Sequence, residues 1–149
     1  MNAITALAIV LALVAVSTAI GFAWKARTGR VRGRSGSETV VTAADVDSPH
    51  PFGSSATLLQ FSTEFCAPCR RTSVVLGALS AERDGVAHVE VDLTDRPDLA
   101  RSFNILQTPT TLLLDASGVV RARIGGAPRR DDLRASLDDL LGRDHVSTA

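Results

Sequence analysis

The chain has few cysteines, aromatic residues and charged residues for its length. Its 149 residues include two cysteines, one tryptophan, one methionine and no tyrosine, and charged side chains make up only 21%. Two cysteines are too few for a disulfide-stapled scaffold, and alone they cannot supply the four ligands of a structural zinc site. The sequence also lacks a phosphate-binding loop, a serine-type triad and a metal-ligand cluster. We therefore expect one ordinary domain with its own core and with no metal or cofactor.

The formal net charge is zero, but the charges are unevenly distributed along the chain. Residues 24–34 carry five basic side chains and no acidic one, whereas residues 35–149 carry 11 basic and 16 acidic side chains, a net of 11 − 16 = −5. An acidic domain behind a short basic segment argues against nucleic-acid binding and points to a membrane instead.

The N-terminal segment has no ionisable side chain from Asn2 to Trp24. A helix over residues 3–24 would be about 33 Å long at 1.5 Å per residue, enough for a hydrocarbon layer of about 30 Å. A cleaved secretory signal is the alternative, with residues 17–19 as a weak cleavage site. It is disfavoured because nothing basic precedes the run and the run is too long. The segment is predicted to be a transmembrane helix, with the lipid bilayer as partner.

The basic residues on the C-terminal side of this helix predict its orientation. Five of them lie within residues 25–34, while the N-terminal side offers only the α-amino group. The positive-inside bias then places the N-terminus outside and the domain in the cytoplasm. Residues 25–37 are basic, rich in glycine and serine and without apolar periodicity, so they are predicted to form a flexible tether ahead of a domain at 38–149.

Apolar periodicity predicts a small α/β domain with the element order β-α-β-α-β-β-α. Strands joined through helices require a parallel portion of the sheet and helices on both of its faces. The predicted strands cover 57–62, 87–92, 110–115 and 119–124, with a further β-prone run at 39–41; the helices cover 66–83 and begin at Pro97 and at Asp131 or Asp132.

Both cysteines fall in one C-x-x-C motif, Cys66 and Cys69, between a buried strand and a helix. The first turn of a helix offers unpaired N–H groups and the positive end of the dipole, which lower the pKa of a thiol at Cys66. Cys69 lies one turn further on, close enough to close a disulfide. Pro68 loses no hydrogen bond in a first turn, and Arg70 adds positive charge. The inferred cycle is attack by Cys66 on a disulfide, followed by release through Cys69.

Three other readings of the cysteine pair are possible. A zinc knuckle would need two more ligands, and His50, His88 and His145 are not in ligand spacing. Covalent haem attachment would need a histidine where Arg70 stands. The third reading is an inert structural pair.

Residues 61–70, FSTEFCAPCR, resemble the active-site stretch of the thioredoxin family. Thr108-Pro109-Thr110 resembles the cis-proline loop of that family, and Asp92 and two glycines at 125 and 126 also fit its pattern. The resemblance covers roughly residues 38–142. It implies the thioredoxin fold, a central mixed sheet flanked by helices, here behind one transmembrane helix.

The resemblance also implies roles for individual residues. Cys66 and Cys69 would form the catalytic, redox-active disulfide. Pro109 would be cis and face this disulfide, so that the backbone of Thr108 can pair with an extended substrate. Phe65, Ala67 and Pro68, which flank Cys66 in the sequence, would complete the substrate-binding surface.

Three positions depart from the family pattern. Gln60 stands where thioredoxins usually carry a buried aspartate that takes a proton from the second cysteine, and Phe65 replaces a tryptophan. His88 aligns with the basic residue that commonly faces the buried acid, and it is either a solvated strand residue or a proton acceptor. We expect deprotonation of Cys69 to rely on water or on His88.

The expected activity is reduction of protein disulfides by a membrane-tethered thiol–disulfide oxidoreductase, supplied with electrons by a reductase. One alternative has the opposite topology and resembles extracytoplasmic thioredoxins that reduce apocytochromes or secreted proteins. Another is a redox-responsive binding module without turnover.

Overall fold

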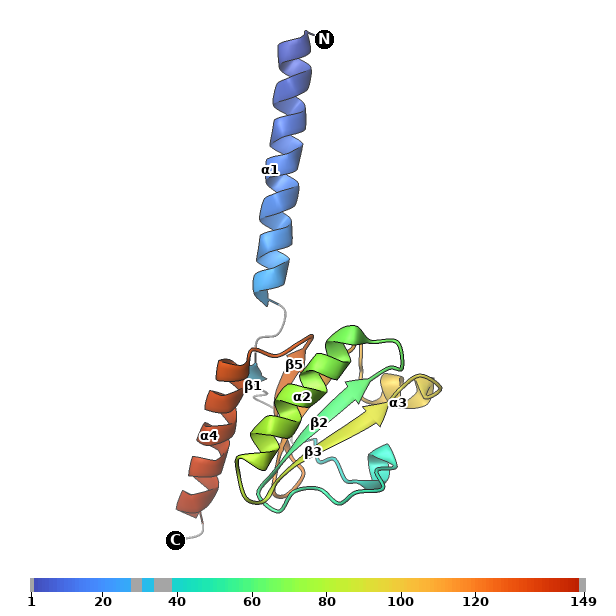
Figure 1. Cartoon of the computed structure of the whole chain (residues 1–149), viewed down its shortest axis with the longest axis vertical. Coiled ribbons are helices and arrows are strands. Elements are labelled where there is room, and N and C mark those ends of the chain that lie inside the picture. Colours follow the sequence, from blue (N-terminus) through green and yellow to red (C-terminus); the bar gives the residue numbers. More distant parts are fainter. Residues whose placement is uncertain (1, 28–30, 34–38, 148–149) are drawn as a thin grey trace.

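The computed structural model describes residues 2–27, 31–33 and 39–147. Apart from β1, the strands and longer helices follow the predicted order (Figure 1). The elements are α1 (Ala3–Arg27), β1 (Arg32–Gly33), the 3₁₀ helix η1 (Ala44–Val46), β2 (Ala56–Ser62), α2 (Ala67–Ala81), β3 (Val86–Asp92), α3 (Pro97–Ser102), β4 (Thr110–Asp115), β5 (Val120–Gly125) and α4 (Arg130–Ser147).

One mixed sheet forms the centre of the α/β domain, in the order β1-β5-β4-β2-β3. β2 and β3 are parallel, while β4 pairs antiparallel with both β2 and β5. α2 and α4 pack on one face of the sheet, and α3 and η1 pack on the other. The predicted parallel portion and the predicted helices on both faces are thus confirmed.

The central strand β2 is buried along its whole length, as its continuous apolar run predicted. Because successive side chains point to opposite faces, Leu58 packs with Leu76 and Leu137 of α2 and α4, whereas Leu59 packs with Leu99 of α3. Each such side chain contributes about 1.5–3 kcal/mol when fully buried. β2 is therefore packed on both faces, and this packing fixes the end of the strand that leads to the cysteines.

The predicted helices are confirmed with small shifts at their ends. α2 begins directly after Cys66, and α3 begins at Pro97. Asn104, which was expected to end the short helix, has a φ of 49°, a left-handed conformation that stops a helix. α4 begins at Arg130, one residue before the predicted start at Asp131.

The N-terminal helix α1 covers the predicted span 3–24 and continues for one more turn. Its stretch Ala3–Ala23 is long and apolar enough to cross a membrane, and none of it is buried against the rest of the protein. A signal sequence near an N-terminus can meet the same criteria of length and hydropathy. The helix is confirmed, and its place in a membrane remains a prediction.

Part of the predicted tether, residues 25–37, has regular secondary structure. Residues 25–27 belong to α1, Val31 packs against the core, and Arg32–Gly33 pairs antiparallel with β5. Residues 28–30 and 34–37 lie outside the described residues, and the flexibility of the segment stays a prediction. Strand pairing uses backbone N–H and C=O groups, so it needs no apolar pattern in the side chains. The β-prone run at 39–41 forms an isolated bridge, between Val40 and Val119 just before β5.

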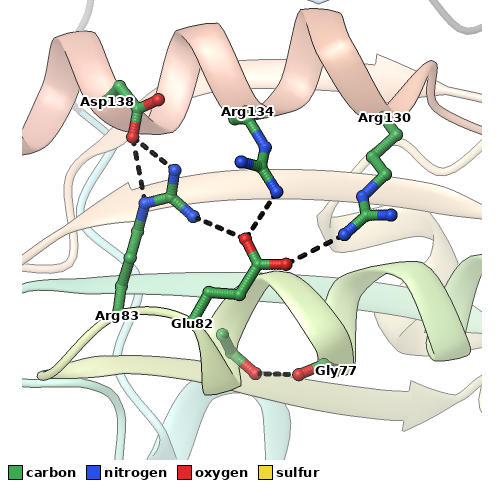
Figure 2. A network of polar contacts seen from close by, with 7 residues as sticks. Gly77, Glu82, Arg83, Arg130, Arg134 and Asp138 are labelled. Carbon is green, nitrogen blue, oxygen red and sulfur yellow. Dashed lines mark hydrogen bonds and ion pairs between the residues drawn. The ribbon is translucent and has the colours of Figure 1, made fainter.

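A network of ion pairs joins the end of α2 to α4 (Figure 2). The Glu82 carboxylate accepts hydrogen bonds from Arg130 at 2.9 Å and Arg134 at 2.6 Å, and it lies 3.5 Å from Arg83. Arg83 also donates to Asp138. Single exposed pairs contribute only about 0–1 kcal/mol, but a network shares the cost of ordering its side chains. The network links α4 to the C-terminal end of α2, the helix that has the cysteines at its N-terminal end.

Candidate active site

The two cysteines form a disulfide at the N-terminal end of α2. The Sγ atoms of Cys66 and Cys69 are 2.01 Å apart and their Cα atoms 5.2 Å apart. Cys66 is 8% exposed and Cys69 only 2%. A partner can therefore approach Cys66 more easily than Cys69.

Cys66 is the N-cap of α2, with an extended backbone at φ −112° and ψ 93°. Its Sγ accepts a hydrogen bond from the backbone N–H of Cys69 at 3.1 Å. Pro68 lies in the first turn, where a backbone N–H would have no partner in the helix. Unpaired N–H groups and the positive end of the dipole stabilise negative charge at this position. Once the disulfide is reduced, the geometry favours a thiolate on Cys66.

Exposed apolar residues flank the cysteines in the sequence, and another precedes the proline loop. The Phe65 side chain is 90% exposed, and Ala67 and Pro68 are exposed as well. Leu106, in the loop before β4, is 87% exposed and was not expected from the sequence. An exposed large apolar residue beside a reactive group is a candidate contact for a partner.

Thr108 and Pro109 lie at the same end of the sheet as the cysteines. The Thr108–Pro109 bond is cis, as the resemblance implied, and Pro109 is buried. Phe61 at the end of β2 is opposite Thr110 at the start of β4, which brings the two segments together. The hydroxyls of Thr63 and Thr108 are 3.4 Å apart and link the loop before Cys66 to the proline loop.

Gln60 is fully buried on β2, beneath the second cysteine. Its side-chain NH₂ donates to the backbone carbonyl of Cys69 at 3.0 Å and to the Glu90 carboxylate at 3.2 Å. Its Oε1 lies 3.3 Å from Nε2 of His88. Glu90 also accepts a hydrogen bond from the Ser73 hydroxyl on α2 at 3.0 Å. Glu90 of β3 therefore places a carboxylate next to the Gln60 amide.

His88 is half-buried on β3, and its Nε2 lies 3.3 Å from Gln60, so it is only partly exposed to solvent. Burial lowers the pKa of His88 below its ordinary value, and the nearby negative charge of Glu90 opposes this shift. A neutral imidazole can accept a proton, directly or through water, which is what the predicted role of His88 requires. That role itself stays a prediction.

Glu90 and two buried threonines were not found from the sequence. Glu90 is opposite Gln60 in the β2–β3 register, and Thr111 is opposite Gln60 on β4. The Oγ1 atoms of Thr72 and Thr111 are buried, and neither has a hydrogen-bond partner among the described residues. Alternation along β3 could have placed Glu90 on the same face as His88, but the register with β2 is set by tertiary pairing. A hydroxyl buried without a partner is unusual in a native core, and water often satisfies such groups.

The loop before Cys66 is tied to the loop after β3. The Asp92 carboxylate accepts from the hydroxyl and the backbone N–H of Thr94, and these hydrogen bonds lower the pKa of Asp92. The Thr94 hydroxyl in turn accepts from the backbone N–H of Glu64 at 2.9 Å. Asp92 therefore positions the loop that carries Phe65 and Cys66.

In the part of the chain that the structure describes, no three His, Cys, Asp or Glu side chains gather as a metal site. The two sulfurs are bonded to each other.

Comparison with known proteins agrees with this geometry. The family model described as Thioredoxin matches residues 43–139. A thioredoxin of Mycolicibacterium smegmatis is 34% identical over 109 residues, which cover 70% of this chain and 96% of the relative. Thioredoxin C-2 of Corynebacterium nephridii is 38% identical over 85 residues, covering 56% of this chain and 78% of the relative.

Solved structures show the same fold. Thioredoxin f2 of Chlamydomonas reinhardtii superposes with a TM-score of 0.51 at 28% identity, over 58% of this chain and 80% of that protein. Thioredoxin of Fasciola hepatica superposes with a TM-score of 0.50 over 58% of this chain and 82% of that protein. With its cysteine pair at disulfide distance, the chain belongs to the thioredoxin family and is a thiol–disulfide oxidoreductase.

Proposed function

We propose that the protein reduces disulfides of partner proteins while α1 holds it in a membrane, with the α/β domain on the cytoplasmic side. The observation that carries the proposal is the Cys66–Cys69 disulfide at the start of α2, in a chain that also has an exposed apolar helix. Large apolar side chains of α1 such as Ile4, Leu7 and Phe22 are 61–83% exposed, and lipid would cover them.

In the proposed cycle the Cys66 thiolate attacks one sulfur of a substrate disulfide. A mixed disulfide forms and the first substrate sulfur leaves as a thiolate. The Cys69 thiolate then attacks Sγ of Cys66, which re-forms the Cys66–Cys69 disulfide and releases the second substrate thiolate. Two electrons reach the substrate, and Cys69 must lose its proton before the second step.

The residues around the disulfide are assigned as follows in this proposal. Phe65, Ala67 and Pro68 contact the substrate, because they are exposed beside Cys66. The backbone of Thr108, ahead of Pro109, pairs with an extended substrate segment. The environment of Gln60 supports His88 or water as the acceptor of the Cys69 proton.

A reductase of the thioredoxin system is the proposed electron donor. One relative, from Mycobacterium leprae, is a "Bifunctional thioredoxin reductase/thioredoxin", 29% identical over 85 residues that cover 56% of this chain and 18% of the relative. In a cytoplasmic compartment the thiol pool keeps such a pair reduced, so that it acts as a reductant.

Catalysis is tested by insulin reduction with dithiothreitol. We expect the full chain in mild detergent to accelerate the reaction and Cys66→Ser to abolish the acceleration. The Cys69→Ser variant should trap a mixed disulfide through Cys66, whereas Cys66→Ser/Cys69→Ser, the matched control, should trap none. If the wild-type chain does not accelerate the reaction, a redox-responsive binding module replaces the enzyme.

Anchoring and orientation are tested separately. The full-length chain should stay with membranes during alkaline extraction, and a shortened chain released from them would identify α1 as a cleaved signal. Protease added to right-side-out spheroplasts should leave the domain intact. Digestion of the domain from outside would establish the extracytoplasmic orientation instead.

A further inference from the structure

The direction in which the chain enters the sheet links α1 to one end of the domain. β1 is antiparallel to β5, with Arg32 opposite Arg123 and Gly33 opposite Ala122. Moving backward from Arg32 toward α1, the chain therefore runs toward Gly125, the last residue of β5. Val31 is half-buried against the core, which holds the chain at this end of the sheet.

This end of the sheet is also the end that carries the disulfide. Gly125 is opposite Thr110 at the start of β4, and Thr110 is opposite Phe61 near the end of β2, from which the chain continues to Cys66. The backbone N–H of Gly126 donates to the carbonyl of Pro109 at 2.7 Å. In Figure 1 the start of α2 lies on the side of the domain from which α1 extends.

The connection between α1 and the sheet is short. Five peptide units join Arg27 to Arg32, so these residues are at most about 18 Å apart. β1 and β2 are three strand spacings apart, about 15 Å along the sheet. A strand of six residues is about 20 Å long. The end of the sheet away from the disulfide therefore lies about 20 Å farther from the connection than the disulfide end does.

We propose that the short connection turns the disulfide end of the domain toward the bilayer, so that the protein acts on disulfides of membrane proteins close to the membrane surface. This inference rests on the proposed function, in which α1 spans the membrane. Outside α1, four large apolar side chains of the described part are exposed: Val40, Phe65, Val74 and Leu106. Phe65 precedes Cys66 and Leu106 lies in the loop before Pro109, so both suit contact with an apolar partner at this end.

The orientation is tested with the full chain in vesicles whose lipid headgroups carry an energy-transfer acceptor. One donor fluorophore is attached to Cys66 in the Cys69→Ser variant. The comparison donor is attached through Ser117→Cys in a Cys66→Ser/Cys69→Ser background. Ser117 is exposed in the turn between β4 and β5, at the opposite end of the sheet. Donor quenching should be several-fold stronger at position 66 than at position 117.

A variant with ten glycine and serine residues inserted between Arg27 and Arg32 serves as the control for the connection. The insertion adds roughly 18 Å of root-mean-square reach, so the difference between the two probes should largely disappear. Insulin reduction by this variant should be unchanged, because the insertion leaves the disulfide end of the domain intact.

A defined substrate provides a second readout. A disulfide peptide is coupled to lipid headgroups through either a short or a long spacer. We expect the wild-type chain to reduce both at similar rates, because its disulfide lies near the membrane surface. Slow reduction of the short-spacer peptide alone would contradict the proposal.

The possible failures can be told apart. Equal quenching at the two positions, or stronger quenching at position 117, would overturn the orientation while leaving the anchor in place. If neither probe is quenched and the chain does not sediment with vesicles, the membrane anchor of the proposed function is wrong and the inference falls with it. Loss of insulin reduction would count against catalysis alone.

Discussion

Replacing Gln60 with aspartate tests how the protein deprotonates Cys69. Gln60 is fully buried and its side chain contacts the Cys69 carbonyl, Glu90 and His88, so a carboxylate at this position would lie beneath the second cysteine. A positioned general base typically contributes about 10²–10⁴-fold to a proton-transfer step. Because water or His88 is expected to serve already, we expect Gln60→Asp to accelerate resolution of the mixed disulfide by about 10–100-fold, at or below the lower end of that range.

The substitution has a calculable cost in stability. It removes one methylene and two donated hydrogen bonds, about 1 kcal/mol each, and it buries a carboxyl group. The Thr111 hydroxyl, which is opposite Gln60 and unpaired among the described residues, can donate to the new carboxyl and offset part of this loss. Burial raises the pKa of the introduced carboxyl, so the folded state binds more protons than the unfolded state. The free energy of unfolding should therefore fall as the pH rises from about 4 through that raised pKa, by up to about 1.4 kcal/mol per pH unit.

The matched control is Gln60→Asn, which has the size of aspartate but cannot ionise. Pre-reduced full chain is mixed with a small disulfide substrate, and release of the second thiol is followed in a single turnover over a range of pH. The advantage of Gln60→Asp over Gln60→Asn should appear as the pH rises through the raised pKa and be absent below it. Equal rates for the two variants at every pH would refute the reasoning that a missing proton acceptor limits the step.

Three further predictions follow from polar contacts outside the disulfide. Because burial lowers the pKa of His88, the unfolded state binds a proton on His88 more readily than the folded state does. The free energy of unfolding should therefore decrease as the pH falls through about 6.5. His88→Gln should reduce this pH dependence, as measured by urea titrations at several pH values. Asp115→Ala should lower the free energy of unfolding by about 2–3 kcal/mol, because it leaves two N–H donors of the β4–β5 turn unpaired. Asp115→Asn keeps an acceptor oxygen and should restore part of the loss. Equal urea-unfolding midpoints for the two variants would contradict this. Glu82→Gln weakens the ion pairs to Arg130 and Arg134 and should lower the free energy of unfolding by only about 0.5–1 kcal/mol, because these groups are partly exposed. High salt should reduce the difference in melting temperature between this variant and the wild type.

Most of the fold could be predicted because its signals are local. The apolar runs at β2 and β4 are continuous since both faces of these strands are covered, and α4 repeats leucines at helical spacing. The C-x-x-C motif between a buried strand and a helix indicated where the site lies. The cis bond before Pro109 followed only from the family resemblance, because most bonds to proline are trans.

The features that escaped prediction depend on tertiary pairing. The strand Arg32–Gly33 pairs through its backbone, and no pattern of side chains marks it. The contact between Gln60 and Glu90 requires the β2–β3 register, which a single sequence does not specify. The contact between His88 and Gln60, which leaves His88 only partly exposed, depends on the same register.

Two short N-terminal segments protect one edge of the sheet from self-association. Arg32–Gly33 pairs with the middle of β5, and Val40 bridges to Val119 just before β5 begins. In the described part of the chain the two edges are then the two-residue strand β1, which is very short, and β3, whose polar His88 and Glu90 make strand addition unfavourable. A shortened version that begins after residue 41, made to avoid α1, would leave β5 bare and should be more prone to aggregate. Crystallisation or NMR samples are therefore better started at or before Val31.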